Sequence, residues 1–143
     1  MKKVITSKST KNVDILVAID ISGNKLLLDS IKSTLSLFDS MTNDYNCNAH
    51  VVLIGDDITL DFDIDDISKL DNFILPEQHQ CNYKKVFEYA EEKIQNDEWD
   101  IFRLYFITDG YGIFPEESNI HTTWITTKNT GVFPFGEVLE IKL

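Results

Sequence analysis

Two apolar runs in this chain each stop at or near an aspartate, and a glycine follows that aspartate within three residues. The first run, residues 15–19, ends at Asp20, and the second, residues 104–107, is followed by Thr108 and Asp109. A continuous apolar run is typical of a strand in a parallel sheet, because both faces of such a sheet are covered. The two runs therefore predict an α/β fold with both aspartates at the carboxyl ends of strands.

The positions of these aspartates predict one shared site. Ligands of open α/β sheets bind just beyond the carboxyl ends of the strands. Carboxylate oxygens suit a hard cation such as Mg²⁺. The alternative is structural: Asp20 and Asp109 would only cap the turn or helix that follows each strand.

Periodicity elsewhere in the chain predicts alternating strands and helices, and hence a parallel-dominated sheet. A helix over residues 25–38 follows from apolar residues at helical spacing, and the turn-forming residues 42–44 end that helical region. A second helix is predicted over residues 83–94. The remaining strands are predicted near residues 48–55, 100–108, 121–126 and 137–143.

Residues 56–65 alternate aspartate with apolar side chains. Strict alternation predicts a strand with one solvated face, antiparallel and at the sheet edge. The spacing of Asp61, Asp63 and Asp65 also occurs at the start of calcium-binding helix-loop-helix loops. Such loops need glycine at the sixth position and glutamate at the twelfth, where this chain has Asp66 and Asn72. We therefore expect a solvated strand and no calcium loop.

The bulk properties predict one cytoplasmic domain over residues 13–143, after a polar lead-in over residues 1–12. The chain has 143 residues, and 13 Lys and Arg against 24 Asp and Glu leave a net charge of −11. This charge argues against binding to a nucleic-acid backbone. No apolar segment has the length of a signal peptide's core or of a membrane span, so we expect no membrane partner. Without an export signal, Cys47 and Cys81 are expected to be thiols.

Several segments carry a resemblance to a known family: residues 20–24, 83–89, 105–115, 124–127 and 134–138. In these segments the chain resembles a von Willebrand factor A-type domain. It is most similar to the domain of this type at the C-terminus of bacterial predicted metallopeptidases. The resemblance covers about residues 12–143. It implies a three-layer, Rossmann-like α/β fold, whose central, mostly parallel sheet has one antiparallel edge strand and helices on both faces.

The resemblance also implies a metal-ion-dependent adhesion site at the strand tips. In the family, an Asp-x-Ser-x-Ser segment, a loop threonine and a later aspartate hold Mg²⁺, which accepts a carboxylate from the partner protein. Asp20, Ser22 and Asp109 match this pattern. Asn24 stands at the second serine, and Cys81 stands at or near the threonine. Because a thiol is a soft ligand and Mg²⁺ prefers hard oxygens, we expect a degenerate site that binds Mg²⁺ weakly or not at all.

The function that the resemblance implies is protein–protein binding without catalysis, at a surface around Asp20, Ser22, Asn24, Cys81 and Asp109. Relatives of this type are associated with ring-forming AAA+ ATPases of the MoxR type, so such an ATPase is the implied partner. No His-Glu-x-x-His motif is present, so peptidase activity is not expected.

Two alternatives to metal-bridged binding stay open. One is a metal-dependent hydrolase or phosphotransfer enzyme that uses Asp20 as nucleophile or ligand. The other is a structural module without a metal. The loop aromatics Tyr111, Phe114, Phe133 and Phe135 also have two possible uses, as partner anchors or as a cover over the end of the sheet.

Overall fold

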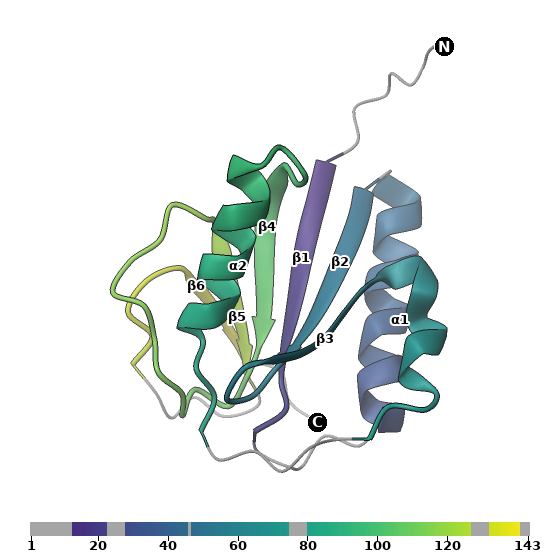
Figure 1. Cartoon of the computed structure of the whole chain (residues 1–143), viewed down its shortest axis with the longest axis horizontal. Helices are drawn as coiled ribbons and strands as arrows, with labels where there is room; N and C mark the ends of the chain where they lie inside the picture. Colours follow the sequence, from purple (N-terminus) through teal and green to yellow (C-terminus); the bar gives the residue numbers. More distant parts are fainter. Residues whose placement is uncertain (1–12, 23–27, 46, 75–79, 127–131, 141–143) are drawn as a thin grey trace.

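The computed structural model describes residues 13–22, 28–45, 47–74, 80–126 and 132–140. In these ranges the chain forms one six-stranded sheet and three helices (Figure 1). The predicted α/β class is confirmed. The helices are α1 (Leu28–Tyr45), the 3₁₀ helix η2 (Ile64–Leu70) and α2 (Lys84–Gln95). The strands are β1 (Val13–Asp20), β2 (Cys47–Ile54), β3 (Ile58–Asp63), β4 (Ile101–Ile107), β5 (Thr122–Thr126) and β6 (Glu137–Glu140). The predicted lead-in, residues 1–12, lies outside the described residues.

The sheet is mostly parallel, with strand order β3-β2-β1-β4-β5-β6. β1 pairs in parallel with both β2 and β4, and the parallel pairing continues through β5 to β6. Only β3 pairs antiparallel, at one edge, as the alternating aspartates predict. The chain leaves β1 toward β2 and later returns on the other side of β1 as β4. The carboxyl ends of β1 and β4 therefore lie side by side where the winding direction reverses.

Both faces of the sheet carry a buried apolar core. On one face, Leu16, Ala18 and Phe106 pack with residues of α2. On the other face, Val17 and Ile19 pack with residues of α1 and η2. Figure 1 shows the same division, with α2 in front of β4 and with α1 and η2 beside β2. Burial on both faces explains why β1 is continuously apolar over residues 15–19.

The prediction that residues 42–44 end the first helical region is wrong, because α1 continues to Tyr45. Asn and Asp have only modest penalties inside a helix, and neither Gly nor Pro interrupts this stretch. Ile31 and Leu35 form the buried stripe, and the Phe38 ring packs against Tyr105 at 5.3 Å between centroids. None of the helices in the described ranges is long and apolar enough to cross a bilayer.

The acidic segment after β2 contains a strand and then a helix. β3 covers residues 58–63, and the chain then turns into η2, which the periodicity does not predict. Phe62, Ile64 and Leu70 are buried against the α1 side of the sheet, while the aspartates between them are exposed. The alternating segment therefore forms a solvated edge strand over residues 58–63, as expected.

Candidate functional site

Asp20 and Asp109 follow neighbouring strands. The parallel register of β1 and β4 pairs Ala18 with Phe106 and Ile19 with Ile107, so Asp20 lies next to Thr108. Ser22 follows directly in the turn after β1, and Cys81 lies before α2 at the same end of the sheet, with its thiol 3.6 Å from the Ile54 carbonyl oxygen at the end of β2. Asn24, the fourth predicted metal ligand, lies outside the described residues.

The Asp20 carboxylate is buried and accepts hydrogen bonds from within its own turn. Only 5% of Asp20 is exposed. Its Oδ1 accepts from the Ser22 backbone N–H at 2.8 Å and from the Ser22 hydroxyl at 2.6 Å. Ser22 is therefore oriented toward the aspartate by two donors, and its hydroxyl proton is already used.

The second oxygen of Asp20 ends a chain of buried hydroxyls. Thr108 Oγ1 lies 2.5 Å from Asp20 Oδ2 and donates to it. Tyr83 OH lies 2.5 Å from Thr108 Oγ1 and 3.3 Å from Asp20 Oδ2. Because each hydroxyl has one proton, the consistent order is Tyr83 to Thr108 to Asp20. Thr108 Oγ1 also accepts the Gly110 N–H at 3.1 Å, so both of its roles are filled.

Sequence reasoning missed Tyr83 and Thr108 as members of this site. Thr108 directly precedes Asp109, and Tyr83 lies two positions after Cys81. A threonine at a strand tip was a usable signal. Nothing local marks Tyr83, because its hydroxyl reaches Asp20 only through the packing of α2 on the sheet.

Cys81 is a buried, protonated thiol in this arrangement. It is 1% exposed, and its Sγ donates to the Ile54 carbonyl. Burial raises the pKa of Cys81 far above its ordinary value, and the negative charges of Asp20, Asp109 and Asp56 raise it further. Asp20 and Asp109 therefore both act electrostatically on Cys81, whereas no direct contact joins the two aspartates in the described structure. A thiol kept neutral is neither a metal ligand nor a nucleophile.

Tyr83 is likewise held in its neutral form. The side chain is fully buried, with its ring packed against Phe106 and Phe114. Burial raises the pKa of Tyr83 far above the ordinary tyrosine value, and the charge of Asp20 adds to this effect. The hydrogen bond with Thr108 opposes the shift but does not cancel it. Tyr83 is therefore a hydrogen-bond donor toward the Asp20 site.

The loop after β4 covers the buried side chains of Cys81 and Tyr83 and is hydrogen-bonded to the backbone of both residues. The Tyr83 N–H donates to the Ile113 carbonyl at 3.0 Å, and the Ile113 N–H donates to the Cys81 carbonyl at 2.9 Å. Gly112 packs so closely that a Cβ added there would lie 2.6 Å from the Cys81 carbonyl oxygen. Asp109 accepts the Tyr111 N–H at 3.0 Å, which closes a turn at the loop's start. The loop is therefore tied to both Cys81 and Tyr83.

The four loop aromatics divide between the two uses left open by the sequence. Phe114, Phe133 and Phe135 pack around the buried Trp124, with ring centroids 5.1, 5.4 and 5.8 Å from it. Tyr111 instead is 61% exposed, and its neighbour Ile113 is 40% exposed. Three of the aromatics thus cover the core, and Tyr111 alone of the four is presented to solvent.

The described residues do not fit a magnesium site of the family's kind. Mg²⁺ demands near-octahedral coordination by hard oxygens. Both oxygens of Asp20 already accept hydrogen bonds from the protein, the Ser22 hydroxyl donates its proton to Asp20, and Cys81 supplies a neutral, soft thiol. Across the part of the chain that the structure describes, no group of three or more His, Cys, Asp or Glu side chains is placed to hold a metal ion.

Comparison with known proteins gives no family for this chain: no protein-family model and no curated protein sequence matches it. The resemblance to von Willebrand A-type domains therefore stays a prediction from the residues quoted above.

Proposed function

We propose that this chain is a non-enzymatic protein-binding module, built as a von Willebrand A-like three-layer domain, whose strand-tip surface contacts a partner without a metal bridge. The strand order and the helices on both faces of the sheet support the fold assignment. The degenerate adhesion site is the contact surface, and a MoxR-type AAA+ ATPase is the proposed partner by analogy.

One observation carries this proposal: the loop after β4, at the strand tips, is held by backbone hydrogen bonds to Cys81 and Tyr83 and yet presents apolar and acidic side chains. Tyr111 and Ile113 are exposed, and half-buried Asp109 starts the same loop. Interfaces gain most from a few large anchors, among which tyrosine is enriched. A loop fastened before binding also loses little conformational entropy when the partner arrives.

The state of Asp20 supports binding over catalysis. A phosphotransfer nucleophile must reach its substrate with a free carboxylate oxygen. Asp20 is 5% exposed, and its two oxygens accept from Ser22 and Thr108. We expect no turnover of p-nitrophenyl phosphate with Mg²⁺ present. Reproducible turnover that Asp20→Asn abolishes would favour the enzyme alternative.

The binding proposal is tested by calorimetric titration of the purified chain with a nucleotide-free MoxR-type ATPase of the same organism. We expect a complex that Tyr111→Ala weakens at least tenfold, about 1.4 kcal/mol, because a hot-spot tyrosine is removed. EDTA should leave the affinity unchanged.

Leu37→Ala is the matched control, since Leu37 is an apolar side chain 74% exposed on α1, away from the strand tips. It should bind like the unmodified chain. Two results would contradict the proposal: an affinity that depends on added Mg²⁺, or equal affinities for the Tyr111 and Leu37 variants. No complex at all would remove the MoxR-type partner.

A further inference from the structure

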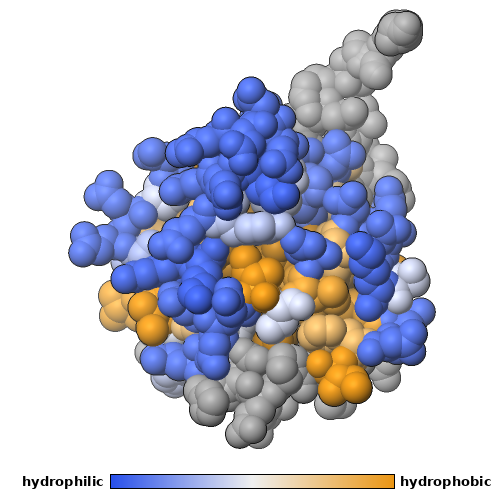
Figure 2. Space-filling view, in the orientation of Figure 1, coloured by the Kyte–Doolittle hydropathy of each residue, from blue (hydrophilic) through white to orange (hydrophobic). Residues whose placement is uncertain are grey.

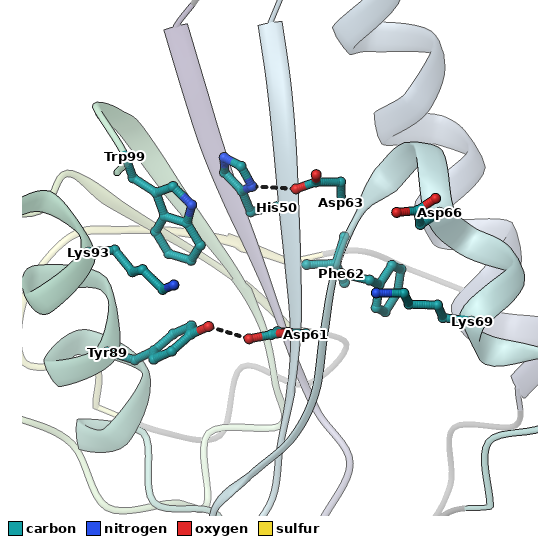
Figure 3. A pocket seen from close by; sticks show the side chains of 10 residues that line it. His50, Asp61, Phe62, Asp63, Asp66, Lys69, Tyr89, Lys93 and Trp99 are labelled. Atoms are coloured by element: carbon teal, nitrogen blue, oxygen red, sulfur yellow. Dashed lines mark hydrogen bonds and ion pairs between the residues drawn. The ribbon is translucent and has the colours of Figure 1, made fainter. Parts of the chain in front are cut away.

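A second feature lies away from the strand tips, on the β2–β3 edge of the sheet beside α2. It is a cavity of about 310 Å³ lined in part by His50, Asp61, Asp63, Tyr89 and Trp99. None of the strand-tip residues lines it. Figure 3 shows these side chains arranged around one hollow, with Trp99, Lys93 and Tyr89 opposite Asp61 and Asp63. We call it the β3 pocket.

The α2 side of the β3 pocket is aromatic. Trp99 and Tyr89 stand at 85° to each other with ring centroids 5.5 Å apart, and His50 stacks on Trp99 at 4.6 Å. The Lys93 ammonium lies 5.4 Å from the Tyr89 centroid and 5.8 Å from the Trp99 centroid. The faces of these rings already attract one cation of the chain itself, as ring quadrupoles do.

The opposite side of the pocket is a pair of oriented carboxylates. Asp61 and Asp63 are two positions apart on β3, so they point to the same face about 7 Å apart. Tyr89 donates its hydroxyl to Asp61, and His50 Nδ1 lies 2.7 Å from Asp63 Oδ1. An ionised carboxylate accepts several hydrogen bonds, so both can take further donors.

The charges around the pocket favour a cation. Its lining holds the carboxylates of Asp61, Asp63 and Asp66 against two lysines, Lys69 and Lys93. Lys93 is already paired with Glu98 at 2.9 Å. The face of the molecule seen in Figure 2 is mostly hydrophilic, with an apolar area near its centre, and the net charge of −11 attracts basic partners from a distance.

We propose that the β3 pocket binds the guanidinium group of an arginine side chain that a partner protein presents. A planar guanidinium has five donors in a rigid fork, which can bridge Asp61 and Asp63, and it stacks on aromatic faces. A lysine ammonium is a compact, strongly hydrated point charge that lacks this planar fork, so it bridges two carboxylates and stacks on a ring less well. The two carboxylates and the aromatic wall thus favour arginine over lysine.

The test is an NMR titration of the labelled chain with N-acetyl-arginine amide, a probe that presents the side chain without free termini. We expect saturable shifts of the Trp99 indole and His50 signals. The neutral citrulline analogue should bind at least tenfold more weakly, since a charge-assisted hydrogen bond is lost.

The double variant Asp61→Asn, Asp63→Asn should also lose at least tenfold in affinity while keeping the unfolding temperature. Asp65→Asn is the matched control: Asp65 is exposed on η2 and outside the pocket lining, so its affinity should stay close to that of the unmodified chain.

Three results would overturn the proposal. The first is equal binding of the arginine and citrulline probes. The second is an equal loss in the Asp65 variant and the double variant. The third is tighter binding of free L-arginine than of the amide, which would make the pocket a small-molecule site in which Lys93 holds the α-carboxylate.

Discussion

Cys81 and Tyr83 are two buried acids that the fold keeps protonated beside a carboxylate. Both are at most 1% exposed, and burial raises the pKa of each well beyond its ordinary range. In the unfolded chain these groups ionise near their ordinary pKa values, about 8.5 for cysteine and about 10 for tyrosine. The difference between the two states makes stability depend on alkaline pH.

The sign of this dependence follows from proton binding. Below about pH 8 both states keep the protons of Cys81 and Tyr83, so their contribution to stability is complete. As the pH rises above about 9, the unfolded state releases protons that the folded state retains. We expect the free energy of unfolding to fall by at most about 1.4 kcal/mol per pH unit for each group.

Urea unfolding at pH 7, 9 and 10 measures this fall. Cys81→Ser removes a titrating group at nearly constant volume, so the fall between pH 9 and 10 should become shallower. A free energy of unfolding that stays constant up to pH 10, or an unchanged slope in the serine variant, would show that Cys81 ionises alike in both states.

The segment between β4 and β5 is held by backbone contacts with the residues that precede α2. Asn82 and Ile113 form an isolated parallel bridge, and the Asn82 N–H donates to the Gly55 carbonyl at 2.9 Å. The loops after β2 and β4 are thereby joined through one short segment. Gly112 makes this possible, because its lack of a Cβ lets the chain approach Tyr83 and Cys81.

Gly112→Ala tests how tightly these loops are joined. The new Cβ would lie 2.6 Å from the Cys81 carbonyl oxygen, a backbone atom that cannot move alone. We expect the free energy of unfolding to drop by about 1–3 kcal/mol, as for other overpacked sites. Thermal unfolding measures the loss.

Tyr111→Ala is the control for this experiment, because Tyr111 lies in the same loop but is 61% exposed. Its unfolding temperature should change little. If Gly112→Ala were as stable as Tyr111→Ala, the loop would have room to relax and would not be the rigid platform that the binding proposal needs.

At the scale of the whole molecule, two apolar cores lie beneath a strongly acidic surface. The sheet separates one core under α2 from another under α1 and η2. The 24 acidic side chains outnumber the 13 Lys and Arg, so like charges repel over the whole surface. Stability should therefore depend on ionic strength more than in a balanced protein.

Raising NaCl from 10 to 150 mM shortens the screening length from about 30 to about 8 Å. We expect the thermal unfolding temperature at pH 7 to rise by a few degrees, since repulsion weakens. The control is the same change near pH 4.5, where the net charge is close to zero and the gain should vanish. A lower unfolding temperature in salt at pH 7 would mean that attractive ion pairs outweigh the repulsion.

The sequence predicts the order and type of most elements, and it predicts that Asp20 and Asp109 lie at or just after the ends of the strands β1 and β4. These features are encoded locally: the apolar run of β1 reflects burial on both sheet faces, and the alternation of β3 reflects an edge. Asp20 with Ser22 is likewise a contact two positions apart. The end of α1 was misplaced and η2 was missed, because both depend on weak local preferences.

The chemical state of the site depends on contacts that no local pattern encodes. Thr108 meets Asp20 across 88 positions of sequence, and Tyr83 reaches it across 63. The β3 pocket likewise unites His50 with Tyr89 and Trp99, which only the packing of the sheet against α2 brings together. Side-chain hydrogen bonds between distant elements are decided by packing, and packing here brings the Thr108 hydroxyl onto the Asp20 carboxylate.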